Sequence, residues 1–316
     1  MVKPFIIGTH NARGMLYAGA EALREGGSAI DAVEISTRLV EANPDDTSVG
    51  LGGISNILGG QEMDASIMDG RTLRSGAVGA IKGFKHPISI ARAVMEEAPH
   101  ILLVGEGAEI FAEKMGFERG DLSTDRSREV YELFIEDALE NLPDDYRSKP
   151  YIIDYVKSWS LRDWYDKLSD EYHGTVNVLA MDGKGNIASA VSTSGTALKF
   201  PGRLGDSAIV GAGNYSDNRY GGGVACTGRG ELAIRLSTAR TIISYLENGL
   251  NLREASFRAM KDIHELNTPG GMNCLVMDSK GNTMSATTRA ERKSIHYYMD
   301  IDMDEPEERV GINVKP

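Results

Sequence analysis

The chain has 316 residues, of which 41% are apolar, 25% charged and 7% aromatic, and its formal net charge at pH 7 is −12. This composition is typical of a soluble globular protein with a large core, and the acidic balance argues against nucleic acid as a partner. No run of 18 or more apolar residues occurs, so we expect neither a membrane span nor a signal peptide, and a cytoplasmic location is the default. Cys226 and Cys274 are too few for a disulfide framework or a metal-binding quartet and are expected to be buried thiols.

The first 120 residues alternate helical and strand patterns. Helical periodicity covers 12–25 and 28–42, with Ser28 as the expected N-cap of the second helix. The remaining elements of this half are predicted as strands at 66–69 and 75–81, a helix at 89–98, a short fully buried strand at 101–104 and a helix at 107–115. A polar stretch at 123–172, with a predicted helix at 129–141, is the most linker-like part of the chain.

Two later segments, 176–192 and 272–287, alternate apolar and polar residues on either side of an Asp/Gly/Asn-rich turn, which predicts two β-hairpins. Helical segments at 231–248 and 252–266 lie between them. Hairpin-paired strands flanked by helix pairs predict an α+β fold with two antiparallel-rich sheets, each covered by helices on its outer face. No gap marks a boundary between domains, so a single domain over 1–316 is predicted.

The first hairpin brings two threonines together. If it is centred on Lys184, Thr193 lies directly across from Thr175, with Cα atoms roughly 4.5–5.5 Å apart. A bulge would slip this pairing by one residue. An ordinary cross-strand Thr–Thr pair is the alternative to a functional pairing of the two hydroxyls.

Several motifs follow one another in a fixed order along the chain. They are Asn43 to Gly50, Met63 to Gly70, His173-Gly174-Thr175-Val176, Ser192-Thr193-Ser194-Gly195, Pro201 to Ser207, and Cys226-Thr227-Gly228-Arg229-Gly230-Glu231. This series resembles the threonine-dependent N-terminal-nucleophile amidohydrolases, namely glycosylasparaginase, the plant-type asparaginases and the isoaspartyl peptidases. The resemblance extends to about Thr288.

The resemblance implies a four-layer αββα sandwich that cuts itself between Gly174 and Thr175, giving the subunits 1–174 and 175–316. Thr175 then becomes an N-terminal nucleophile whose own α-amine is its base. The chemistry is reasonable, because a threonine hydroxyl needs a base and a free α-amine has a pKa of about 7.7–8.0. The family mechanism needs no cofactor and no metal, and a homodimer of processed units is expected.

Further roles are implied residue by residue. Thr193 supplies a second hydroxyl beside the nucleophile, and Thr227 and Gly228 supply a hydroxyl and a backbone N–H to the developing oxyanion. Arg203 and Asp206 match positions that bind the α-carboxylate and the α-ammonium of an aspartyl substrate. Ser48 matches a position close to the nucleophile. Taken alone, the Thr-Gly pair could be a helix cap and the Arg–Asp pair a loop contact.

Four positions depart from the family pattern. His10 stands where glycosylasparaginases have an aromatic residue, Gly174 is typical of the plant-type and isoaspartyl branch, Asn177 replaces a usual glycine, and Arg229 adds a charge. The sequence predicts an autoprocessed β-aspartyl amidohydrolase acting on a small asparagine-derived substrate, either asparagine or an N4-substituted asparagine, with release of aspartate. An isoaspartyl peptidase of the same class, and an inert binding protein that never cleaves, are the alternatives.

Overall fold

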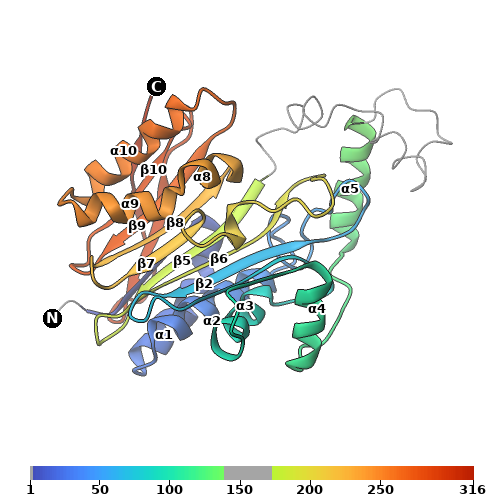
Figure 1. The fold of residues 1–316 in the computed structure, drawn as a ribbon, viewed down its shortest axis with the longest axis horizontal. Coiled ribbons are helices and arrows are strands. Elements are labelled where there is room, and N and C mark those ends of the chain that lie inside the picture. The colour runs from blue at the N-terminus through green and yellow to red at the C-terminus, as the bar shows by residue number, and fades with distance from the viewer. Residues whose placement is uncertain (1–2, 139–172) are drawn as a thin grey trace.

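Figure 1 shows the computed structural model of the chain, which describes residues 3–138 and 173–316. Two β-sheets face each other, and each is covered by helices on its outer side. The predicted α+β fold of the αββα type is therefore confirmed. The linker-like stretch at 139–172, with the end of the helix predicted at 129–141, lies outside the described residues.

The larger sheet of the described chain has eight strands in the order β12-β11-β1-β5-β6-β2-β3-β4. Neighbouring strands are antiparallel except β3 and β4, which are parallel. The strands are β1 (Phe5–Gly8), β2 (Met63–Asp69), β3 (Ser75–Ile81), β4 (Leu102–Val104), β5 (His173–Met181), β6 (Ile187–Thr196), β11 (Ile295–Asp300) and β12 (Glu307–Val310). The predicted first hairpin is β5–β6, at the centre of this sheet.

The second sheet has five strands in the order β13-β10-β9-β8-β7. The pairing is antiparallel except between β10 and β13. Its strands are β7 (Asn214–Asp217), β8 (Gly222–Gly228), β9 (Met272–Asp278), β10 (Thr283–Thr287) and β13 (Ile312–Asn313). The predicted second hairpin is β9–β10, so both hairpins form as the turn residues indicate.

Helices form the outer layers (Figure 1). The described helices are η1 (His10–Met15), α1 (Leu16–Arg24), α2 (Ala29–Glu41), α3 (Pro87–Glu97), α4 (Gly105–Lys114), α5 (Asp125–Ala138), η3 (Asp206–Ala208), α8 (Gly230–Leu236), α9 (Thr238–Glu247) and α10 (Leu252–Glu265). Helices α1, α2 and α3 share a core with the larger sheet, and α9 and α10 share one with the smaller sheet. Within the described ranges, none of these helices is long and apolar enough to cross a membrane.

The two faces of β5 explain how the site is oriented. Because successive side chains point to opposite faces of a strand, Val176 and Val178 pack against the helices, whereas Leu179 and Met181 pack between the sheets. Thr175 has the same parity as Leu179 and therefore belongs to the face that looks toward the second sheet.

The same alternation of side chains determines which residues of β8 face the larger sheet. On β8, Val224 and Cys226 pack toward helices α9 and α10, and Ala225 packs between the sheets. Thr227 has the parity of Ala225 and so faces the larger sheet. The two sheets thus direct Thr175 and Thr227 into the space between them.

Local signals in the sequence account for several elements and fail at others. Ser28 caps α2 with a reciprocal capping box to Asp31, as the sequence predicts. The strand predicted at 101–104 is not buried: β4 ends its sheet, and Ile101 is 58% exposed. The helix predicted at 231–248 is broken at Ser237, which adopts a left-handed conformation with φ 48°. Both free cysteines are buried, as expected.

Candidate active site

A cavity of about 560 Å³ opens between the two sheets at one end of β5 and β8. Gly174 and Thr175 of β5, Thr227 and Gly228 of β8, and Ser48 from the loop after α2 all line it. Five of the predicted site residues therefore line one cavity.

Thr193 reaches the same place through a bulge. From Val176 to Met181 the β5–β6 register is the predicted one, but it shifts between Gly174 and Val176 because β6 carries an extra residue there. As a result the Thr193 hydroxyl donates a hydrogen bond to the Gly174 carbonyl oxygen at 2.5 Å, and Thr193 Oγ1 accepts one from the Gly195 N–H at 2.9 Å. A hydroxyl thus polarises the carbonyl that precedes Thr175.

Gly174 packs closely against the side chain of Ser48. A Cβ atom at position 174 would overlap the Ser48 side chain, so only glycine fits there. The Ser48 hydroxyl and its backbone N–H both donate to the Asp46 carboxylate, at 2.5 Å and 2.9 Å. These bonds fix the Ser48 side chain against the Gly174–Thr175 peptide.

A chain of hydrogen bonds links Asp46 to strand β5. Asn11 Nδ2 donates to Asp46 at 2.9 Å, the Thr9 hydroxyl donates to Asn11 at 2.8 Å, and the Asn177 backbone N–H donates to Thr9 Oγ1 at 3.0 Å. Thr9, Asn11 and Asp46 all line the cavity. None of the three was predicted as a site residue from the sequence, although their polar residue types beside His10 and Ser48 are a usable signal.

The opposite wall holds donors near the end of β8. Gly228 has φ 130°, a conformation that favours glycine, and a Cβ atom there would overlap the Gly271 carbonyl oxygen. Arg229 does not line the cavity, and its Nη1 donates to the Pro269 carbonyl at 2.5 Å. The charge that Arg229 adds to the motif is therefore not on the cavity wall.

Arg203 and Asp206 lie behind this wall and do not line the cavity. The Arg203 guanidinium holds the Glu231 carboxylate through Nε at 2.9 Å and Nη2 at 2.8 Å. Asp206 is 4% exposed and packs against Gly230, and burial raises its pKa to about 7. The structure brings the two residues to the end of β8 but not into contact with Thr175.

Several other residues that line the cavity were not predicted from the sequence. Arg289, Arg292 and Lys293, from the segment after β10, line the wall. So does His296, whose ring nitrogens lie 3.0 Å from the Ser285 and Thr283 hydroxyls and whose pKa burial lowers to about 4. No sequence motif indicated these four, because they reach the cavity only through the pairing of β10 and β11 with other strands.

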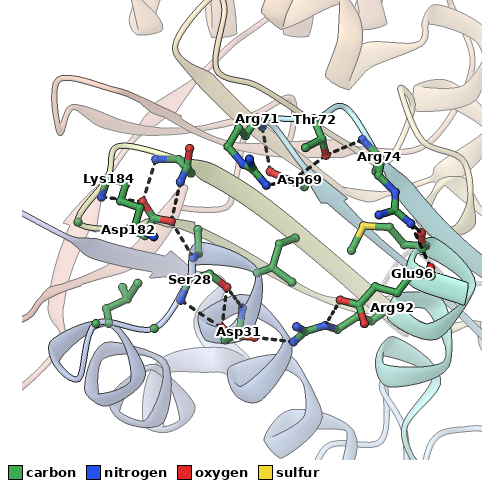
Figure 2. Close-up of a pocket in the computed structure, with 18 residues that line it drawn as sticks. Ser28, Asp31, Asp69, Arg71, Thr72, Arg74, Arg92, Glu96, Asp182 and Lys184 are labelled. Carbon is green, nitrogen blue, oxygen red and sulfur yellow. Dashed lines mark hydrogen bonds and ion pairs between the residues drawn. The ribbon is translucent and has the colours of Figure 1, made fainter.

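A larger cavity of about 820 Å³ lies at the turn of the β5–β6 hairpin, at the opposite end of these strands from Gly174 (Figure 2). Two of its charged side chains already have partners: Arg92 binds Asp31 at 2.7 Å and Glu96 at 2.8 Å, and Asp182 accepts a hydrogen bond from the Lys184 backbone N–H at 2.9 Å. Size therefore does not mark the active site here. The smaller cavity is lined by Thr175 and by Gly174, whose carbonyl oxygen accepts a hydrogen bond from the Thr193 hydroxyl.

Comparisons with known proteins show which family the chain belongs to. A family profile described as asparaginase matches residues 8–303. The chain is 37% identical over 282 residues to the plant-type L-asparaginase of Pyrococcus furiosus, covering 89% of this chain and 86% of that protein. It is 36% identical over 275 residues to the N(4)-(beta-N-acetylglucosaminyl)-L-asparaginase of Elizabethkingia miricola (86% and 72% covered) and 38% identical over 268 residues to the isoaspartyl peptidase of Salmonella typhimurium (84% and 79% covered). The chain belongs to the asparaginase family of N-terminal-nucleophile hydrolases and is an amidohydrolase.

Proposed function

We propose that the chain cleaves itself between Gly174 and Thr175 and that Thr175 then hydrolyses the side-chain amide of asparagine or of an N4-substituted asparagine. The observation that carries the proposal is the Thr193 hydroxyl on the Gly174 carbonyl, beside Thr175 in the cavity. In the precursor, the Thr175 hydroxyl attacks this carbonyl carbon and the peptide nitrogen leaves, which forms an ester. That step already frees the α-amine of Thr175, and water then hydrolyses the ester and releases residues 1–174.

In the mature protein the α-amine takes the proton of the Thr175 hydroxyl, which attacks the β-amide carbon of the substrate. The proton passes to the leaving amine, and water hydrolyses the resulting aspartyl ester to aspartate. Thr227 and Gly228 line this space from β8. The Thr227 hydroxyl and the Gly228 N–H are the proposed oxyanion donors, each worth about 10²–10³ in rate. Arg203 and Asp206 are the proposed partners of the α-carboxylate and α-ammonium. The homodimer of processed units remains part of the proposal.

We expect small β-amides to be better substrates than a glycan amide. His10 lines the cavity and is smaller than the aromatic residue it replaces, so it offers less surface for stacking against a sugar. The test compares kcat/KM for asparagine, a β-aspartyl dipeptide and N-acetylglucosaminyl-asparagine on one processed preparation. A large preference for the glycan amide would refute the argument from His10. A protein that stays uncleaved and hydrolyses none of the three substrates would favour the inert binding protein.

Replacing Arg203 with alanine should spare self-cleavage but weaken substrate binding. Cleavage acts on a peptide carbonyl, whereas the substrate carboxylate loses hydrogen bonds worth about 1.5–3 kcal/mol each, and about 1.4 kcal/mol is tenfold. We expect kcat/KM to fall by at least about tenfold. Arg219→Ala is the matched control, because Arg219 also grips a carboxylate, that of Asp217, through Nε and Nη2. If kcat/KM of Arg203→Ala stays close to the wild-type value, Arg203 does not bind the substrate and serves only as the ion-pair partner of Glu231.

The pKa of Asp206 predicts a pH dependence. Burial raises this pKa to about 7, so the carboxylate that would receive an α-ammonium is fully ionised only above neutrality. For substrates with a free α-amine, kcat/KM should rise as pH increases through about 7. Asp206→Asn should remove this rise near pH 7, so that only the titration of the Thr175 α-amine remains in the pH profile. It should also lower kcat/KM more for substrates with a free α-amine than for N-acylated ones. An unchanged pH profile in the variant would exclude Asp206 as the ammonium partner.

A further inference from the structure

Asn177 of β5 is a buried polar side chain on the wall of the active-site cavity. It is 0% exposed, and it lines the cavity two residues after Thr175, on the same face of the strand. Within the described part of the chain, neither its Nδ2 nor its Oδ1 has a hydrogen-bond partner. Leaving a buried amide unpaired costs free energy, so a side chain of this kind beside a nucleophile indicates a ligand.

The surroundings of Asn177 within the sheet do not satisfy its amide. The Asn177 N–H donates to Thr9 Oγ1 at 3.0 Å, and the Asn177 carbonyl oxygen accepts from the Thr9 N–H at 3.1 Å, so these backbone groups are used. Val191, directly opposite on β6, and Leu179, two residues further along β5, are apolar members of the core between the sheets. The cavity is therefore the side from which a partner can reach the amide.

Other polar side chains of the cavity are already engaged. Ser285 Oγ and His296 Nδ1 lie 3.0 Å apart, and Asn273 Nδ2 donates to the Thr227 carbonyl oxygen at 3.4 Å. Asn177 differs from these side chains because its donor and its acceptor are both available to a ligand.

The place of Asn177 indicates which part of a substrate it meets. Thr175 attacks a carbon that carries an oxygen, a nitrogen and the chain leading to the head group. The oxygen is proposed to meet the donors of β8, and the head group the residues that follow β6, which leaves the nitrogen. Because residues two apart on one strand face start roughly 6.5–7 Å from each other, the Asn177 amide can reach an atom bonded to the carbon that Thr175 attacks.

We propose that Asn177 binds the nitrogen of the scissile amide and makes the protein selective for amides over esters. The inference rests on the function proposed above for Thr175. Asn177 Oδ1 accepts a hydrogen bond from the substrate N–H, while the α-amine of Thr175 passes the proton of the hydroxyl to this nitrogen and the C–N bond breaks. In the second step, the water that replaces the amine donates to Oδ1 and accepts from Nδ2. Its OH goes to the aspartyl carbon, and its other proton goes to Thr175 Oγ1.

The test compares asparagine with aspartic acid β-methyl ester, which has the same head group and carbonyl but no N–H, and whose alkoxy oxygen is a poor acceptor. Asn177→Leu keeps the branched shape of the side chain and removes both polar groups. In its processed form, we expect kcat/KM to fall by about tenfold for asparagine, the effect of one hydrogen bond, and by less than about twofold for the ester. Asn177→Ala, which adds no bulk, should lower the ratio of amide to ester in the same way and replaces the leucine variant if that protein is not processed.

Thermal unfolding separates this role from a structural one. Because an apolar group replaces an unpaired buried amide, Asn177→Leu should raise Tm by about 2 °C although its activity falls. Asn214→Leu is the matched control: Asn214 of β7 is also 0% exposed, but its Nδ2 donates to the carbonyl and hydroxyl oxygens of Ser66, at 3.2 Å and 3.0 Å. This control should lower Tm and keep the wild-type ratio of amide to ester.

Three results would overturn the inference. An unchanged ratio of amide to ester in Asn177→Leu, with a wild type that hydrolyses asparagine, would show that Asn177 does not bind the nitrogen and would leave the proposed function standing. A Tm of Asn177→Leu that falls as in Asn214→Leu would show that the protein itself holds the amide. A wild-type protein that cleaves itself but hydrolyses neither asparagine nor the ester would refute the proposed function, and this inference with it.

Discussion

Thr175→Ala should leave the protein as one chain of 316 residues and reduce amide hydrolysis by roughly 10⁴-fold or more. The same hydroxyl is the proposed attacking group in self-cleavage and in turnover, so one change should abolish both. Intact mass spectrometry measures the first effect, and aspartate release measures the second.

Thr175→Ser is the matched control, because it keeps the hydroxyl and removes only a methyl group. We expect this variant to cleave and to hydrolyse substrate, at reduced rates. Cleavage of Thr175→Ala at the same bond would show that another group is the nucleophile, whatever the cavity geometry suggests.

Thr193→Val should slow self-cleavage by about 10²–10³-fold, the effect of losing one donor to a developing oxyanion. The valine keeps the shape of threonine but cannot donate to the Gly174 carbonyl, which the Thr193 hydroxyl contacts at 2.5 Å. The rate constant follows from the mass of purified precursor sampled over time.

Two controls separate this chemical effect from a loss of stability. Thr193→Ser keeps the hydroxyl and should cleave at close to the wild-type rate. Thr196→Val makes the same replacement at another buried threonine of β6 and should also cleave normally. If Thr193→Val folds and cleaves as fast as the wild type, the hydrogen bond to Gly174 is structural only.

Much of the fold could be predicted because its signals are local. The Asp/Gly/Asn turns define both hairpins, and the β5–β6 register follows from the turn up to Val176. The bulge at Thr193 and Ser194 could not be predicted, because it depends on contacts from elsewhere: Asp64 of β2 pairs with Thr193, and the Ser194 N–H donates to the Ser48 carbonyl at 2.9 Å. The exposure of β4 likewise depends on its place at the end of the sheet order.

The candidate site, like the fold, has one part that could be predicted from the sequence and one part that could not. The motifs around Thr175 and Thr227 were recognisable, and strand parity brings both to the space between the sheets. The pairing of Arg203 with Glu231 was not foreseen, because nothing in the loop sequence shows which carboxylate the guanidinium meets. The position of the cavity segment at 289–292 depends on Asn313, which is distant in sequence and lies beyond the region of resemblance.

The intact mass of the purified wild-type protein, followed by N-terminal sequencing, tests the central claim most directly. We expect two polypeptides, residues 1–174 and 175–316, and a new N-terminus that reads Thr-Val-Asn-Val. A single uncleaved chain that stays intact on prolonged incubation, or a fragment that begins at any other residue, would contradict it.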